Sequence, residues 1–226
     1  MIIGGGRGMG AATARAMAAK GYRLAIMSPS DTCEKLADEL GGVASRGRAE
    51  NAADTQALFD LTMKTYGRVD AVFINCGGPP KGDLLEISEE DWDRANDMLV
   101  KPVIRVAKMV TPVMEKQGGG SIVTLTSFSA LEPSLVFPTS SVYRLAVSGF
   151  AKLYADRYGP ANIRMNCLLP GFTDSLDVGK FAEMSAMKRI ARAEEQGNVA
   201  AFLLSDDSSY ITGQSLVSDG GLNRRV

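Results

Sequence analysis

Short apolar segments alternate with longer amphipathic or alanine-rich segments along almost the whole chain. The apolar segments predict strands at residues 1–5, 22–28, 42–48, 69–75, 120–127, 162–170 and 213–221. The intervening segments predict helices at 9–21, 31–42 (with Asp31 as its N-cap), 52–67, 89–117, 140–158 and 196–206. Continuous apolar strands separated by helices are typical of a parallel sheet covered on both faces. The pattern therefore predicts an α/β fold with a doubly wound parallel sheet.

Residues 1–226 are interpreted as one domain, because this length suits a single core and no repeat, low-complexity segment or linker interrupts the pattern. The first strand is unusually short. Two explanations stay open for it: the strand is trimmed, or the native start lies upstream of Met1. A polar stretch at about 172–193, with short helical pieces, lies outside the regular alternation.

The composition excludes several classes of protein. A net charge of −1 lacks the basic excess of nucleic-acid-binding proteins, so no nucleic acid partner is expected. Three widely spaced cysteines indicate reduced thiols in the cytoplasm, not disulfides or a zinc site. With no histidine, the chain can build neither a serine–histidine triad nor a histidine-ligated metal site. We expect no membrane span, because no apolar run approaches ~18 residues, and no signal peptide, because glycines begin at Gly4.

Three glycines, Gly4, Gly8 and Gly10, connect the first strand to the first helix, with Arg7 and Met9 among them. A tight turn here needs residues without a Cβ atom, so that a pyrophosphate can approach the backbone closely. The start of the following helix supplies free N–H groups and the positive end of the helix dipole. Because a strand and a helix flank these glycines correctly, we expect a dinucleotide-binding turn instead of an ordinary flexible loop.

Four segments of the chain resemble the short-chain dehydrogenase/reductase family. The glycine spacing matches its G-x-x-x-G-x-G, and INCGGPP resembles its N-N-A-G segment. IRMNCLLPGFTDS resembles its I-R-V-N-x-x-x-P-G-x-x-x-T, and FLLSDDSSYITGQSLVSDGG resembles its closing S-D-x-S-x-x-x-T-G-Q-x-x-x-V-D-G-G. The resemblance runs from Met1 to about Gly221 and implies a Rossmann-type fold that binds a nicotinamide cofactor. It also implies cofactor contacts at the glycine turn and at Asn75, Gly77, Pro170, Gly171 and Thr173.

The choice between NADP and NAD depends on charge near the second strand. NAD-preferring sites usually place an acid there, which binds the ribose 2′-hydroxyl and repels a 2′-phosphate. Ser28 ends this strand, and no carboxylate follows before Asp31. Arg7 can reach a 2′-phosphate, and Arg48 stands where the family often has an adenine-contacting aspartate. We therefore expect NADP(H) in preference to NAD(H); the alternative for each arginine is an ordinary solvated surface charge.

The resemblance also places the family's serine, tyrosine, lysine and asparagine tetrad. Ser127 ends the fifth strand, where the family has its serine, and the family's tyrosine follows thirteen positions later, at Ser140. The family's lysine comes four residues after the tyrosine and falls on Arg144, since RLAVSGFAKL resembles K-A-A-V-x-G-F-x-K-x-L. The asparagine falls on Leu99. Three of the four positions therefore depart from the pattern.

These departures change the expected acid–base chemistry. Reducing a carbonyl needs a proton for the forming alkoxide, and a serine hydroxyl is too weak an acid for Ser140 to supply it unaided. Arg144 can hold the nicotinamide ribose but cannot relay a proton. Tyr143 is the candidate substitute acid, because it lies one helical turn from Ser140. The alternatives are packing for Tyr143, a strand-end hydrogen bond for Ser127 and a helix N-cap for Ser140.

Three functions stay open on this evidence. The first is an NADP(H)-dependent oxidoreductase acting on a small carbonyl, alcohol or imine, with the 172–193 segment as substrate lid. The second is a catalytically inactive NADP(H)-binding protein, and the third a lyase similar to halohydrin dehalogenases, which however lack the glycine turn. The family's fourth and fifth helices usually form subunit contacts, so the resemblance implies a homodimer or homotetramer.

Overall fold

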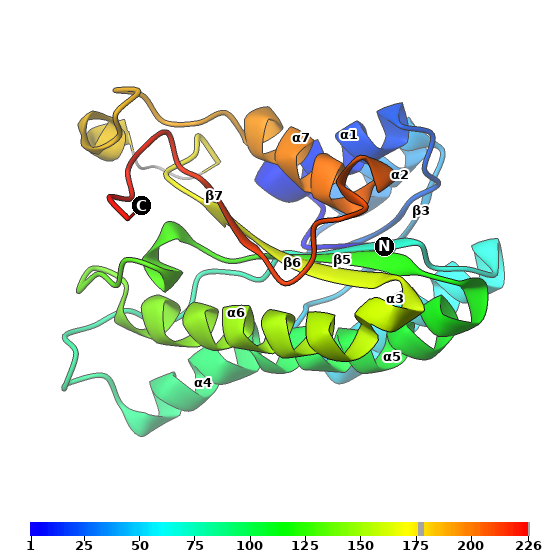
Figure 1. Ribbon diagram of the computed structural model, residues 1–226, viewed down its shortest axis with the longest axis horizontal. Coiled ribbons are helices and arrows are strands. Elements are labelled where there is room, and N and C mark those ends of the chain that lie inside the picture. Colours follow the sequence, from blue (N-terminus) through cyan, green and yellow to red (C-terminus); the bar gives the residue numbers. More distant parts are fainter. Residues whose placement is uncertain (176–178, 226) are drawn as a thin grey trace.

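The computed structural model describes residues 1–175 and 179–225. Seven strands in this part of the chain form one parallel sheet (Figure 1). The strands are β1 (Ile2–Ile3), β2 (Ala25–Ser28), β3 (Val43–Arg46), β4 (Ala71–Ile74), β5 (Gly120–Leu125), β6 (Ile163–Pro170) and β7 (Ser215–Ser218). Their order across the sheet is β3-β2-β1-β4-β5-β6-β7. The predicted doubly wound, Rossmann-type fold is confirmed. Its strand order reverses between β1 and β4, which is where such sheets bind ligands.

Helices cover both faces of the sheet, as predicted (Figure 1). They are α1 (Gly8–Ala19), α2 (Thr32–Leu40), α3 (Ala52–Tyr66), α4 (Glu89–Leu99), α5 (Lys101–Gln117), α6 (Pro138–Tyr158) and α7 (Ala193–Leu204). Four 3-10 helices are η1 (Phe128–Ala130), η2 (Gly159–Ala161), η3 (Gly179–Met184) and η4 (Asp206–Ser208). Helices α1, α2 and α7 bury one core against the sheet, and α3, α5 and α6 bury the other.

Several element bounds differ from the sequence prediction, and two of these differences have a clear local cause. The single helix expected at 89–117 is divided at Val100 into α4 and α5. The division has a local cause, because Pro102 has no N–H for the carbonyl of the preceding turn and fits best in the first turn of a new helix. The first strand spans only two residues, because the chain leaves extended geometry at Gly4, whose φ is +72°.

Among the described residues, none of the helices is both long and apolar enough to cross a membrane. A cavity of about 240 Å³ opens at the amino ends of β1, β2 and β4, beside Tyr22, Tyr66 and Asp70. That is the edge of the sheet opposite the glycine turn, so this cavity is separate from the site described next.

Candidate active site

The glycine turn is held closely against the end of β4. A Cβ atom on Gly4 would collide with the carbonyl oxygen of Asn75, and one on Gly10 would collide with the carbonyl oxygen of Gly4. Asn75 Nδ2 donates a hydrogen bond of 3.2 Å to that same Gly4 oxygen. The turn is thus a cradle that only glycine can form, and Asn75 is one of its supports. Gly77, two residues further on, is exposed.

The cradle leads directly into α1, whose first turn contains no acidic residue. The N-cap residue Arg7 is exposed, its side chain makes no capping bond, and it pairs with none of the described acidic residues. The side chain of Met9 packs against the hydrophobic core, so it presents only backbone to the turn. The free N–H groups at this helix start suit the phosphates of a dinucleotide.

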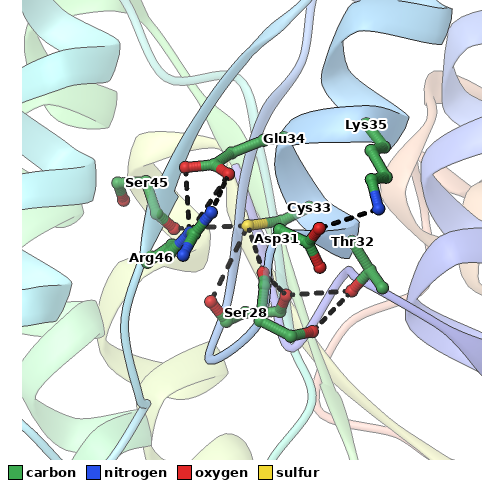
Figure 2. Close-up of polar contacts among 9 residues, drawn as sticks. Ser28, Asp31, Thr32, Cys33, Glu34, Lys35, Ser45 and Arg46 are labelled. Carbon is green, nitrogen blue, oxygen red and sulfur yellow. Dashed lines mark hydrogen bonds and ion pairs between the residues drawn. The ribbon is translucent and has the colours of Figure 1, made fainter.

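A cluster of hydroxyl groups lies beside the cradle, at the start of α2 (Figure 2). Thr32 Oγ1 lies 2.8 Å from Ser30 Oγ and 3.5 Å from Ser28 Oγ. A Cβ atom on Gly6 would strike the hydroxyls of both Ser28 and Thr32. A ligand on the glycine turn would therefore extend onto these hydroxyls.

The acidic residues near this hydroxyl cluster are paired with cations. Asp31 accepts an ion pair of 2.7 Å from Lys35, and Glu34 one of 2.6 Å from Arg46 (Figure 2). The hydrogen bond from Lys35 holds the pKa of Asp31 below its ordinary value. Asp31 precedes α2 as predicted but makes no side-chain capping bond, because its carboxylate is turned to Lys35.

Arg48, the second arginine expected near the cofactor, lies on the surface. Its Nη1 is 3.5 Å from Glu50 Oε1, and its backbone N–H donates to Asp54. Its charge is thus partly balanced within the protein. Arg7 is the more available cation of the two.

Arg144 is buried between α6 and the end of β5. Its Nε donates a hydrogen bond of 3.0 Å to Ser140 Oγ, and its Nη1 donates one of 2.7 Å to the carbonyl oxygen of Leu125. Both acceptors are neutral, and no carboxylate pairs with this guanidinium among the described residues. Burial accordingly lowers the pKa of Arg144 from its ordinary value.

Ser140 is not a helix N-cap, because α6 begins two residues earlier at Pro138 and Phe137 is its N-cap. Its Oγ accepts from Arg144 and donates to none of the described residues. The hydroxyl proton of Ser140 is thus available to an incoming group. The two residues lie four positions apart on α6, so their side chains are neighbours on one face of the helix.

Ser127 shows the same arrangement at the end of β5. Its Oγ accepts bonds from the backbone N–H and the hydroxyl of Ser129, at 3.2 Å and 3.1 Å, and so caps η1. With both acceptor positions occupied, its own proton can only be donated outward. The bond from the backbone N–H of Ser129 is the kind of strand-end contact that the alternative interpretation of Ser127 expected. It leaves the hydroxyl proton free all the same.

Leu99 and Cys76 form the apolar side of this region. Together with Arg144 they line a small void under β5, which is too small to hold a water molecule. Burial of the thiol raises the pKa of Cys76 to about 12, although the nearby Arg144 acts in the opposite direction. The place where the family anchors a water for proton relay is therefore apolar here.

Tyr143 contacts the neighbouring helix α4. Its ring packs edge-on against Trp92 of α4, with 5.8 Å between the ring centroids. Desolvation raises the pKa of its hydroxyl, and the charge of Asp93 adds to the rise. Both features suit packing between helices better than proton donation. The hypothesis that Tyr143 is the substitute acid stays a prediction.

The segment after β6 closes over the glycine turn. Pro170 ends β6, and a Cβ on Gly171 would meet Asp219 after β7. Thr173 is buried and its Oγ1 lies 2.6 Å from Ser175 Oγ. A Cβ on Gly8 would come within 2.7 Å of Ser175 Cβ, so Ser175 covers the start of α1.

Sequence reasoning did not select Ser175 as a site residue. The final threonine of the family segment P-G-x-x-x-T corresponds to this position, so the motif itself contained the signal. The expected lid at 172–193 is described only in part, since residues 176–178 lie outside the described residues. Its far end is held by a bridge between Thr173 and Ala191.

Comparison with known proteins shows which family the chain is similar to. The profile of the family described as enoyl-(acyl carrier protein) reductase matches residues 4–223. The chain is 35% identical to the oxidoreductase UcpA of Salmonella typhimurium, covering 98% of this chain and 92% of that protein. It is 33% identical to human dehydrogenase/reductase SDR family member 4, covering 97% of this chain and 85% of the relative.

Two solved structures share the fold. The NADPH-dependent reductase YwfH, involved in bacilysin biosynthesis, superposes with a TM-score of 0.92 at 25% identity, covering 100% of this chain and 98% of that one. The L-sorbose reductase of Gluconobacter frateurii, complexed with NADPH and L-sorbose, has a TM-score of 0.91 at 24% identity and covers 100% and 96%. The second likeness concerns the fold alone.

Proposed function

Because the chain belongs to the short-chain dehydrogenase/reductase family, we propose that it is an NADP(H)-dependent oxidoreductase that acts on a small carbonyl, alcohol or imine substrate. One observation carries the proposal. The glycine cradle is intact, and at the same edge of the sheet the hydroxyls of Ser127 and Ser140 accept hydrogen bonds from Ser129 and Arg144 and donate their protons to none of the described residues.

The residues at the cradle fit a dinucleotide. Gly4, Gly8 and Gly10 leave room for a pyrophosphate, and the start of α1, which has no acidic residue and no side-chain cap, supplies N–H donors to it. Asn75 stiffens the turn, and Arg144 offers the remaining nitrogen of its guanidinium, Nη2, to the nicotinamide ribose. Pro170, Gly171 and Thr173 would border the carboxamide. When bound, the nicotinamide supplies or accepts a hydride at C4.

The two serines would hold the reacting oxygen. Each hydroxyl can donate one hydrogen bond to a carbonyl oxygen that gains negative charge during hydride transfer. Arg144 stands behind Ser140 and polarises its hydroxyl through the Nε bond. This arrangement stabilises charge without requiring either serine to ionise.

Charge near α2 favours NADP over NAD. The hydroxyls of Ser28, Ser30 and Thr32 suit phosphate oxygens, and Arg7 is free to pair with a 2′-phosphate. Ion pairs with Lys35 and Arg46 reduce the repulsion from Asp31 and Glu34. The YwfH relative is described as NADPH dependent, which supports the same choice.

Calorimetry tests the cofactor choice directly. Titration with NADPH and NADH under one condition should give micromolar binding of NADPH and weaker binding of NADH. Equal or tighter binding of NADH would remove the charge argument. A failure of both to bind would contradict the proposed function as a whole.

A second candidate is a protein that binds NADP(H) without turnover. The observation behind it is the absence, among the described residues, of a titratable acid that shares the bonding of Ser127, Ser140 and Arg144. A screen of ketones, quinones and cyclic imines, followed by NADPH absorbance, separates the two candidates. Consumption of NADPH with any class supports the oxidoreductase.

We also propose a cytoplasmic homodimer or homotetramer. The cysteines are free thiols, and apolar side chains are exposed along the outer face of α6, at Val142, Leu145 and Leu153. Further ones lie on α7 and β7, at Phe202 and Val217. Light scattering at several protein concentrations tests this assembly, and a monomer at every concentration would contradict it.

A further inference from the structure

Four phenylalanine rings meet at the carboxyl ends of β5 and β6. Phe128, Phe137, Phe172 and Phe181, the phenylalanine cluster, are all half-buried. The centroid of the Phe172 ring lies 5.3 Å from the centroid of the Phe128 ring and 6.5 Å from that of the Phe137 ring. It stacks on Phe181 at 4.5 Å with only 12° between the planes. The cluster thus presents flat apolar surfaces from several separate segments.

Each segment of the cluster is tied to the candidate active site. Phe128 follows Ser127 directly, and Phe137 is the N-cap of the helix that carries Ser140. Phe172 follows the Pro170–Gly171 pair, and Phe181 lies in η3. A substrate oxygen bonded by the two serines would therefore place the rest of the substrate beside aromatic rings. Such surfaces favour planar conjugated molecules.

The site is poorly suited to ordinary ketones. Hydride addition to a ketone gives an alkoxide about as basic as hydroxide, so a positioned acid is needed to protonate it. The serines can donate hydrogen bonds but are not such acids. Tyr143 packs on Trp92 with its pKa raised. A phenolate-type anion needs no such acid, because its conjugate acid has a pKa of only ~10.

The positive charge of Arg144 also favours a substrate that becomes an anion. It is buried, and its two observed hydrogen bonds go to neutral oxygens, so its positive charge is not balanced by a described carboxylate. An anion that forms beside it gains from this charge. An iminium cation would be repelled. Lys81, whose Nζ lies 4.9 Å from the centroid of the Phe137 ring, adds a second positive charge near the cluster.

We propose that the substrates are planar conjugated carbonyl compounds, quinones above all, whose reduction leaves a delocalised oxyanion. This inference rests on the proposed function and names its substrate class. A hydride with its electron pair leaves NADPH and forms an O–H bond at one carbonyl oxygen of the quinone, while the π electrons shift through the ring onto the second carbonyl oxygen. The products are NADP⁺ and a hydroquinone monoanion, which takes its proton from water after release. No protein group needs to lose a proton.

The test compares three compounds that share a fused two-ring skeleton: naphthoquinone, tetralone and dihydroisoquinoline. NADPH absorbance is followed without oxygen, and the rate without enzyme is subtracted. The expected result is a kcat/KM for the quinone at least ~10²-fold above those of the ketone and the imine, the low end of what a positioned acid contributes. If the ketone or imine reacts as well as the quinone, this inference is overturned and the proposed oxidoreductase stands. If NADPH binds but none of the three reacts, both fail.

Variants separate recognition by the protein from the intrinsic reactivity of quinones. Ser140→Tyr restores a phenolic acid and should raise tetralone turnover with little gain for the quinone. Phe137→Leu should raise KM for naphthoquinone several-fold, whereas Phe59→Leu, at another half-buried phenylalanine on α3, serves as the matched control. Thermal melting checks that each variant folds. Equal KM values in both leucine variants, or a Ser140→Tyr variant that gains quinone turnover most, would overturn the inference.

Discussion

Nε of Arg144 donates a 3.0 Å hydrogen bond to Ser140 Oγ, one helical turn earlier on α6. By the resemblance, these two positions correspond to a lysine and a tyrosine that together make a proton donor in the family. Here they make a cation-backed hydroxyl that can donate a hydrogen bond but is not an acid. The account of this protein depends on that difference.

Replacing the buried Arg144 should weaken the binding of NADPH. Arg144→Ala removes two hydrogen bonds from a charged donor and the group offered to the ribose, so NADPH affinity should fall by tenfold or more, at about 1.5–3 kcal/mol per charged bond. Arg144→Lys should recover only part of this, because the fork geometry is lost. Arg157→Ala, exposed on the same helix, is the control. Unchanged affinity in Arg144→Ala would refute the register assigned to α6.

The hydroxyl of Tyr143 should be dispensable. Tyr143→Phe keeps the contact with Trp92, so kcat should stay within about twofold of wild type, whereas Ser127→Ala should lose ~10²-fold or more, as removal of an oxyanion-holding donor does. Steady-state kinetics on the best substrate measures both. Loss of activity in Tyr143→Phe with intact folding would show instead that this tyrosine is the substitute acid.

Arg7 should discriminate between the two cofactors. It is exposed and unpaired among the described residues at the N-cap of α1, so Arg7→Ala should weaken NADPH by about tenfold and leave NADH nearly unchanged. Calorimetry with both cofactors gives the two affinities. Arg48→Ala is the matched comparison, since Arg48 is already paired with Glu50. An equal loss for NADPH and NADH would count against a 2′-phosphate contact.

Two buried thiols should make the protein less stable at alkaline pH. Cysteine ordinarily titrates near pH 9, but burial raises the pKa of Cys76 and Cys167 to about 12. Between these values the unfolded chain binds fewer protons than the folded protein, so the free energy of unfolding falls as pH rises. The slope is at most ~1.4 kcal/mol per pH unit for each thiol.

Urea denaturation across this pH range measures that slope. The double variant Cys76→Ala/Cys167→Ala should be less stable at neutral pH, because atoms are removed from buried positions, but its stability should fall less steeply with pH. The slope is therefore the informative quantity. If the double variant shows the wild-type slope, other groups cause the alkaline loss.

The fold could be predicted from the sequence because its strands are continuous apolar runs and its glycine turn has a strict steric need. Details that depend on competition between local interactions could not be predicted in the same way. The helix at 89–117 is divided at Val100 because Pro102 starts a new first turn, and Asp31 prefers Lys35 to the free N–H groups of α2. Neither outcome follows from periodicity.

The resemblance aligned Ser127, Ser140 and Arg144 with the family's site, and this alignment stays a prediction. Spacing could not show which hydrogen bonds these residues make, nor that the hydroxyl protons of Ser127 and Ser140 have no acceptor among the described residues. The packing of Tyr143 on Trp92 joins α6 to α4, a contact between helices that sequence distance does not reveal. The phenylalanine cluster likewise combines segments far apart in the chain.

A crystal structure of the protein with NADP⁺ bound tests the central claim most directly. The account predicts that the hydroxyls of Ser127 and Ser140 both face the nicotinamide C4 side of the site, with Arg144 bonded to the ribose and Tyr143 still against Trp92. A structure in which the Tyr143 hydroxyl turns into hydrogen-bond distance of Ser127, with Ser140 directed away, would contradict it.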